Sequence, residues 1–94
     1  MKVHWSPRAL AEIDAIFAFV AAADRALAEL LTFEIEARAA KLAEYPEVGR
    51  PGRVDGTREF VVTGTPYIIP YRVRDGRVEI LAALHASREW PDHL

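Results

Sequence analysis

The chain has 94 residues, of which 51% are hydrophobic and 28% charged, with no cysteine and a formal net charge of −2. This composition excludes a disordered chain, a disulfide framework and a thiolate metal site, and no apolar run approaches the ~18 residues of a membrane span. We therefore expect one domain over residues 1–94 in a cytoplasmic protein, and any contact with nucleic acid must be local because the net charge is negative.

The first half of the chain predicts a short strand followed by a helical hairpin. Residues 2–5 are typical of a strand, and Ser6 and Pro7 mark the N-cap and first position of a helix. Asp24 can cap a second helix, which Pro46 and Gly49 end. Apolar residues at helical spacing are Leu10, Ile13, Phe17 and Val20, then Leu27, Leu31, Ile35, Ala39 and Leu42, with Leu30 and Phe33 widening the second stripe.

The second half predicts three strands, at residues 57–63, 67–74 and 77–85. Between the last two, Asp75-Gly76 is a strong signal for a two-residue hairpin turn. This turn sets a register in which Arg72 lies opposite Glu79, and an opposite-charge pair supports it. Pro70 suits an edge or a bulge, because proline removes a donor from the ladder. Helices covering one face of such a sheet give an α+β class.

Side chains alternate across a strand, so this register divides the sheet into two predicted faces. The face expected under the helices carries Tyr67, Ile69, Tyr71, Val73, Val78, Ile80, Ala82 and Leu84. The other face is expected to carry Ile68, Pro70, Arg72, Arg74, Glu79, Leu81, Ala83 and His85. Because this second face is half apolar, we expect another segment or another chain to cover part of it.

Candidate functional side chains collect around the end of the third predicted strand. His85 could act as a general acid or base, since histidine titrates near neutral pH, or be an ordinary hydrogen-bonded strand-end residue. Arg58, Arg72 and Arg88 could hold a phosphate backbone or an acidic segment, although Arg72 already has Glu79. Trp90 could anchor an interface or cap the sheet. The three histidines at positions 4, 85 and 93 lack the spacing of a metal site, so we predict no metal and no cofactor.

Five segments in a fixed order carry a family resemblance. They are Trp5–Ala9, Tyr45–Gly52, Gly56–Val62, Tyr67–Val73 and Ile80–Pro91. Together they resemble the RelE/ParE superfamily of bacterial toxins from type II toxin–antitoxin systems, and the resemblance covers nearly the whole chain.

The resemblance implies a fold of a short N-terminal strand, a helical hairpin and a three-stranded antiparallel meander. It also implies a cognate antitoxin that wraps and neutralises the toxin, contact with operator DNA only through that antitoxin, and no membrane. On this basis the residues assigned to target or antitoxin binding are Arg50, Arg72, Arg74, Arg88 and Trp90.

The superfamily divides by target: RelE-like members cleave mRNA in the ribosomal A site, and ParE-like members poison DNA gyrase. In RelE-like toxins an Arg follows the Tyr or His that opens the strand beginning here at Tyr67, where this chain has Ile68. We therefore predict ParE-like poisoning of gyrase. The first alternative is a metal-independent endoribonuclease that uses His85 with Arg58 or Arg88. The second is a non-enzymatic relic that only binds its antitoxin.

Overall fold

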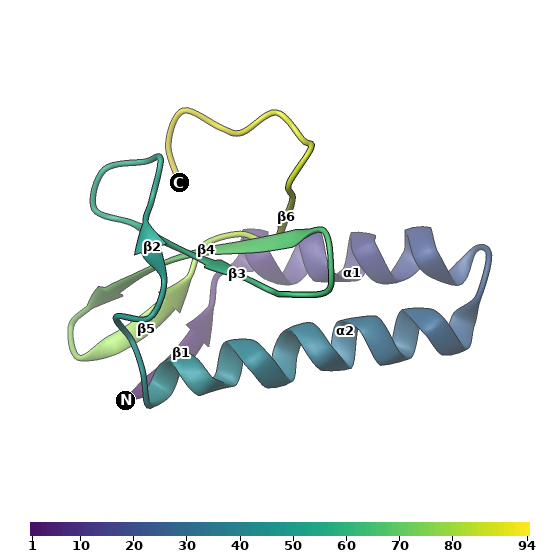
Figure 1. Ribbon diagram of the computed structural model, residues 1–94, viewed down its shortest axis with the longest axis horizontal. Helices are drawn as coiled ribbons and strands as arrows, with labels where there is room; N and C mark the ends of the chain where they lie inside the picture. Colours follow the sequence, from purple (N-terminus) through teal and green to yellow (C-terminus); the bar gives the residue numbers. More distant parts are fainter.

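Two layers make up the structure, a helical hairpin and the sheet against which it packs (Figure 1). The computed structural model describes all residues from 1 to 94. Its helices are α1 (Pro7–Ala21) and α2 (Arg25–Ala40), followed by the 3-10 turn η1 (Lys41–Ala43), and no helix is long and apolar enough to cross a membrane. Its strands are β1 (Lys2–Trp5), β2 (Arg50–Pro51), β3 (Arg58–Val61), β4 (Tyr67–Arg74), β5 (Arg77–Ile80) and β6 (Leu84–His85). The predicted α+β class is confirmed.

Both helices begin where their capping residues predict. The side-chain oxygen of Ser6 accepts a hydrogen bond from the Ala9 N–H over 3.1 Å, and Pro7 occupies the first helical position. The Asp24 Oδ1 atom accepts a hydrogen bond from the Leu27 N–H, also over 3.1 Å. Each bond satisfies an amide group that the start of a helix otherwise leaves free.

The Asp75-Gly76 turn forms the predicted hairpin between β4 and β5. Both residues have positive φ, 55° for Asp75 and 71° for Gly76, as a type I′ turn requires. The register is the predicted one, with Arg72 opposite Glu79. The sheet order is β1-β5-β4-β3-β2, and β6 also pairs with β4. Two features go beyond the predicted meander: β1 runs parallel to β5, and the short strand β2 lies in the predicted polar connection.

The third predicted strand, residues 77–85, is interrupted by a bulge. Arg74 of β4 lies opposite Arg77 of β5, whereas Tyr67 of β4 lies opposite His85 of β6. The two pairings differ in register by one residue, so one extra residue sits between β5 and β6. As a result, residues 77–85 form two strands that both pair with β4.

The bulge reverses the predicted faces of the residues that follow it. His85 and Ala83 lie on the side that the helices cover, and Leu84 lies on the opposite side, so the predicted face was wrong for all three. Pro70 supplies a physical cause. The Leu81 N–H donates to the Pro70 carbonyl over 2.9 Å, but proline has no N–H with which to return the bond, so the ladder cannot continue regularly.

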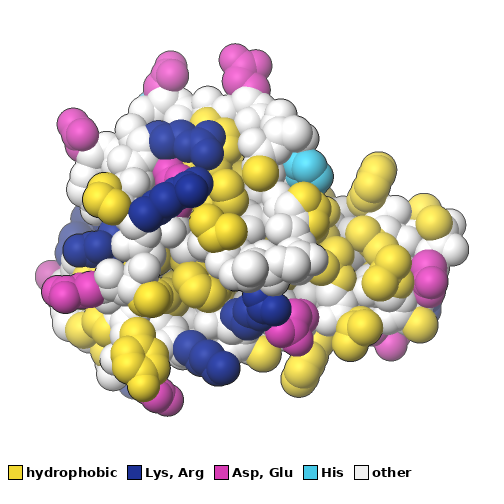
Figure 2. Space-filling view, in the orientation of Figure 1, with side chains coloured by type: hydrophobic (Ala, Val, Ile, Leu, Met, Phe, Trp, Pro, Cys, Tyr) yellow, Lys and Arg dark blue, Asp and Glu magenta, His cyan; other side chains and the backbone are white.

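The helical hairpin buries only part of the predicted set: Ile13, Ile35, Ala39 and Leu42 are buried as expected. The buried residues are Ala9, Ile13 and Ile16 in α1, Ala28, Thr32, Ile35 and Ala39 in α2, and Leu42 in η1. Leu10, Leu27, Leu30 and Phe33 are exposed instead, which corrects the predicted stripes. The fully buried alanines allow close approach of the helices, and the larger apolar side chains then point outward. Figure 2 shows apolar side chains over much of the hairpin.

Candidate functional site

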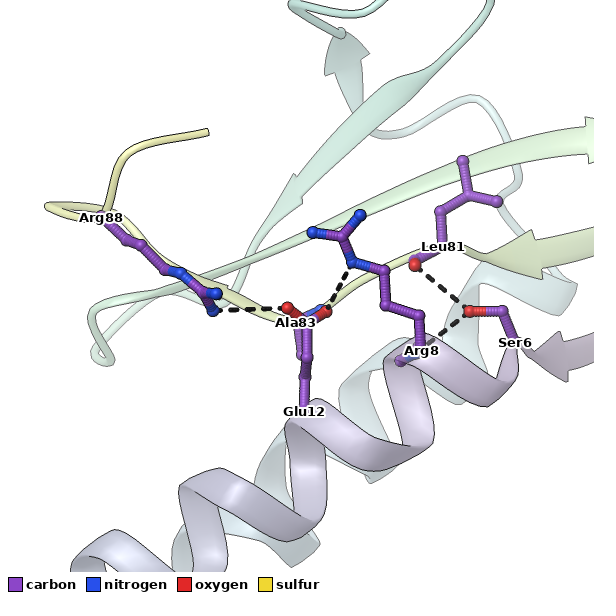
Figure 3. Close-up of polar contacts among 7 residues, drawn as sticks. Ser6, Arg8, Glu12, Leu81, Ala83 and Arg88 are labelled. Atoms are coloured by element: carbon purple, nitrogen blue, oxygen red, sulfur yellow. Dashed lines mark hydrogen bonds and ion pairs between the residues drawn. The ribbon is translucent and has the colours of Figure 1, made fainter. Parts of the chain in front are cut away.

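The bulge between β5 and β6 is held by the first turns of α1 (Figure 3). The Ser6 hydroxyl donates to the Leu81 carbonyl over 3.2 Å. This carbonyl receives no hydrogen bond from Pro70, because proline has no N–H. The Glu12 Oε1 atom accepts the Ala83 N–H over 3.1 Å. These bonds join residues more than 70 positions apart in sequence. They satisfy backbone groups of the bulge that form no hydrogen bond with a neighbouring strand.

Glu12 also ties the C-terminal segment, residues 86–94, to α1. Its Oε2 atom lies 3.3 Å from the Arg88 Nη1 atom, and its Oε1 atom lies 3.6 Å from the Arg8 Nε atom. The Glu12 side chain is mostly buried, with 14% of its surface exposed, so an unpaired carboxylate there would be costly. Arg88, which we had assigned to target or antitoxin binding, therefore has a structural contact of its own.

His85 lies beside Tyr67, on the side of the sheet that the helices cover. The two rings meet edge to face with their centres 5.5 Å apart. The His85 Nδ1 atom accepts the Ser87 N–H over 3.1 Å, which leaves the Nε2 atom to carry the proton in the neutral ring. His85 and Arg88 share the lining of an open groove of about 250 Å³ with apolar residues of α1. This pair could meet one ligand.

Arg58 lies far from this groove. It pairs with Tyr71 on β4, and its Nη1 atom donates to the carbonyls of Gly49, over 2.9 Å, and Glu47, over 3.2 Å. His85 pairs with Tyr67, four residues away along the same strand, which is about 13 Å at the rise of a strand. Because β3 and β6 flank β4 on opposite sides, the true separation is larger. The structure does not bring Arg58 and His85 together.

Five arginines gather around two carboxylates on the side of the sheet away from the helices; we call this surface the arginine face. Its members are Arg50, Arg53, Arg72, Arg74 and Arg77, with Glu59 and Glu79 beneath them. Dark blue side chains flank a magenta one at this end of the molecule in Figure 2. Three members, Arg50, Arg72 and Arg74, were assigned from the sequence, and two were missed. Arg77 could have been found from its predicted position opposite Arg74.

Each carboxylate of the arginine face is buried and shared. Glu59 lies 3.0 Å from the Arg50 Nη2 atom and accepts the Arg53 backbone N–H over 2.8 Å. Glu79 lies 2.7 Å from the Arg72 Nε atom, and Arg74 and Arg77 approach within 3.5 Å and 3.2 Å. The Arg72 hydrogen bond in particular, and then Arg77 and Arg74, hold the pKa of Glu79 below its usual range.

Trp90 lies beside Arg53 of the arginine face. The Arg53 guanidinium lies 3.9 Å from the centre of its ring, a cation–π contact. Figure 1 shows the C-terminal segment, in yellow, arching from β6 back toward the loop that carries Arg53. Ile68, Pro70, Leu81 and Leu84 are all buried. The cover expected for this half-apolar face is therefore supplied by the chain itself.

Comparison with known proteins agrees with this architecture. Residues 3–90 match the family model described as the ParE toxin of the type II toxin–antitoxin system parDE. A Sinorhizobium fredii protein, Y4kP, is 45% identical over 94 residues, which is 99% of this chain and 96% of that protein. Toxin RelE2 of Caulobacter vibrioides is 39% identical over 87 residues, which is 93% of this chain and 97% of that toxin.

A solved structure gives the same result at the level of the fold. A chain from the chromosomal ParDE toxin–antitoxin system of P. aeruginosa superposes with a TM-score of 0.82 and 26% identity. The match covers 90% of this chain and 95% of that one. The family resemblance seen in the sequence is confirmed, and the chain belongs to the ParE toxin family of type II toxin–antitoxin systems, within the RelE/ParE superfamily.

Proposed function

We propose that this toxin arrests growth by poisoning DNA gyrase. The observation that carries the proposal is the burial of Ile68. RelE-like nucleases have an Arg at this position, and here an apolar side chain lies buried, with 5% of its surface exposed, on the side of the sheet away from the helices. The family match to the parDE toxin points the same way.

The separation of His85 from Arg58 also favours gyrase poisoning over RNA cleavage. Cleavage of RNA without a metal needs a base within hydrogen-bond reach of the 2′-hydroxyl and a cation on the same phosphate. His85 pairs with Tyr67 and Arg58 pairs with Tyr71, on opposite edges of β4 and four residues apart along it, which is too far apart to act on one phosphate. The guanidinium of Arg58 is also engaged by the carbonyls of Glu47 and Gly49.

A second candidate function is RelE-like cleavage of mRNA on the ribosome. It is favoured by the 39% identity to a toxin named RelE2 and by the groove that His85 shares with Arg88. In this version His85 is the acid or base and Arg88 is the cation. The ion pair between Arg88 and Glu12 opposes this second function, because a nuclease that uses Arg88 on the phosphate would have to break the pair.

We propose that the cognate antitoxin covers the outer side of the helical hairpin. Leu27, Leu30 and Phe33 are exposed along one side of α2, each over more than half of its surface. A patch of this kind on a small soluble chain marks a surface for a protein partner. An amphipathic segment of the antitoxin is the occupant that fits a helical surface.

The test is induction of the chain alone in bacteria with pulse-labelling of DNA and protein synthesis during the first minutes. Early loss of DNA synthesis with continued translation supports gyrase poisoning, and purified gyrase should then accumulate cleaved DNA in the presence of the toxin. Early loss of translation contradicts it and supports the nuclease. A His85→Ala chain separates the two, because it should remain toxic as a gyrase poison and become harmless as a nuclease. A wild-type chain that is harmless at high expression would indicate a relic.

A further inference from the structure

The arginine face carries more positive charge than its carboxylates neutralise. Five arginines share two glutamates, so three positive charges are left without a carboxylate. Lys2 lies on the same side of the sheet, opposite Arg77 in the register of β1 and β5. The whole chain nevertheless has a formal net charge of −2. The strands therefore concentrate positive charge on one surface, and Asp55 and Asp75 lie in the turns that flank it.

The arginines of this face are both held and accessible. Arg50, Arg53, Arg74 and Arg77 each expose about half of their side chain, between 46% and 55%. Each contacts a buried carboxylate with one or two nitrogens, and a guanidinium has five N–H donors. Because about half of each side chain is exposed, donors remain available to an anion, and the ion pairs that hold the arginines lower the entropic cost of binding it.

The spread of the face suits several phosphates at once. Glu59 lies opposite Pro70 on one side of β4, and Glu79 lies opposite Arg72 on the other. From strand spacing and rise, the two carboxylates are roughly 12 Å apart. Duplex DNA carries one charge per about 1.7 Å of axis, so 12 Å contains about seven phosphates, of which about half face one side. The face can therefore meet about three phosphates.

Other occupants fit this surface less well. Proteins that bind single strands stack bases on free aromatic rings, but the Trp90 ring is already covered by Arg53. A protein partner needs an apolar centre within its polar rim, but Ile68, Leu81 and Leu84 on this side of the sheet are buried. What remains is a set of guanidinium groups, which bind phosphate oxygens strongly and often through two hydrogen bonds.

We propose that the arginine face binds the phosphate backbone of duplex DNA. The binding is independent of sequence and involves about three phosphates. That this DNA is the duplex held by gyrase rests on the proposed function; the binding itself does not. The face then contacts the nucleic acid beside the enzyme, while the helical hairpin stays free for the antitoxin.

The test is fluorescence anisotropy of a labelled 20-base-pair duplex titrated with the full-length chain at several salt concentrations. We expect a dissociation constant of roughly 10⁻⁴ to 10⁻⁶ M near physiological salt and a slope of about −3 in the plot of log K against log salt. Arg74→Gln should lower the slope by about one and weaken binding about eightfold at 0.1 M salt. Arg25→Gln is the matched control, because it removes the same charge from α2, where Arg25 pairs with Glu29, and it should leave both values unchanged.

Several outcomes would overturn the inference. They are absence of binding at low salt, equal losses for Arg74→Gln and Arg25→Gln, or tighter binding of a single strand of the same length. A loss of antitoxin binding but not of DNA binding in Arg74→Gln would assign the face to the antitoxin instead. DNA cleavage by purified gyrase is measured in parallel. Binding without gyrase poisoning removes only the proposed target, and poisoning without binding removes only this inference.

Discussion

Tyr71 connects the buried core to the chain that leads into the arginine face. Its ring is fully buried, and its hydroxyl donates to the Pro46 carbonyl over 2.7 Å and accepts the Gly49 N–H over 2.9 Å. Gly49 fits closely against this ring, because a Cβ atom there would come within 2.6 Å of Tyr71 Cε1. The residue after Gly49 is Arg50, which reaches Glu59. Replacement of Tyr71 by Phe should therefore destabilise both the fold and this connection.

The expected loss of stability follows from the two backbone groups that Tyr71→Phe leaves without a partner. The buried Gly49 N–H costs about 1–3 kcal/mol when it loses its partner, and the partly buried Pro46 carbonyl costs about 1 kcal/mol, so we expect a total of about 2–4 kcal/mol. A domain of this size has about 5–10 kcal/mol of stability and loses about 4–8 °C of melting temperature per kcal/mol. The melting temperature should therefore fall by roughly 8–30 °C.

The assay is unfolding by urea and by heat, followed by circular dichroism. Tyr45→Phe is the matched control, because Tyr45 is exposed over 63% of its surface and removal of its hydroxyl should change stability by less than about 0.5 kcal/mol. A Tyr71→Phe chain that differs from wild type by no more than this control would refute the reasoning. It would mean that water or a shifted backbone replaces both hydrogen bonds.

Four further predictions concern titration, the C-terminal segment and the antitoxin surface. Burial raises the pKa values of Tyr67 and Tyr71 above 10.0. Their contribution to the free energy of unfolding should therefore be constant below pH 10 and be lost as the pH rises through the folded-state pKa values; urea unfolding at alkaline pH would measure this loss. Arg72 lowers the pKa of Glu79 below 4.5, so Glu79→Gln should be less stable than wild type at neutral pH, and the difference should vanish as the pH falls through that lowered value. Glu12→Gln should release Arg88 and speed tryptic cleavage of the C-terminal segment, whereas the exposed Glu36→Gln should not. Phe33→Ser, at an exposed position, should change stability by less than about 0.5 kcal/mol yet weaken antitoxin binding by about tenfold.

The features predicted correctly depend on neighbours in the sequence. Ser6 and Asp24 cap helices that begin one residue later, and Asp75-Gly76 fixes the register of the strands it joins. In each case the determining atoms lie within a few residues, and the physical rule needs no tertiary information. The pairing of Arg72 with Glu79 follows from that register alone.

The features predicted wrongly depend on distant contacts. The bulge before His85 combines the missing N–H of Pro70 with two hydrogen bonds to side chains more than 70 residues away in sequence: the Ser6 hydroxyl donates to Leu81, and the Glu12 carboxylate accepts from Ala83. The burial of the hairpin depends on how two helices and a sheet share space, so apolar spacing alone pointed to Leu27 where Ala28 is buried. Arg53 was missed because the loop that places it beside Glu59 has no sequence signal of its own.

The bulge also bears on which function this sheet can support. With a regular strand, His85 would have pointed to the same side as the arginine face, and a histidine among five arginines could have served a nuclease. The extra residue turns His85 to the helix side beside Tyr67, while the arginines remain on the other side. One phosphate cannot meet both sets. The proposed binding of duplex DNA uses the arginines without the histidine, and the bulge keeps the two sets on opposite sides of the sheet.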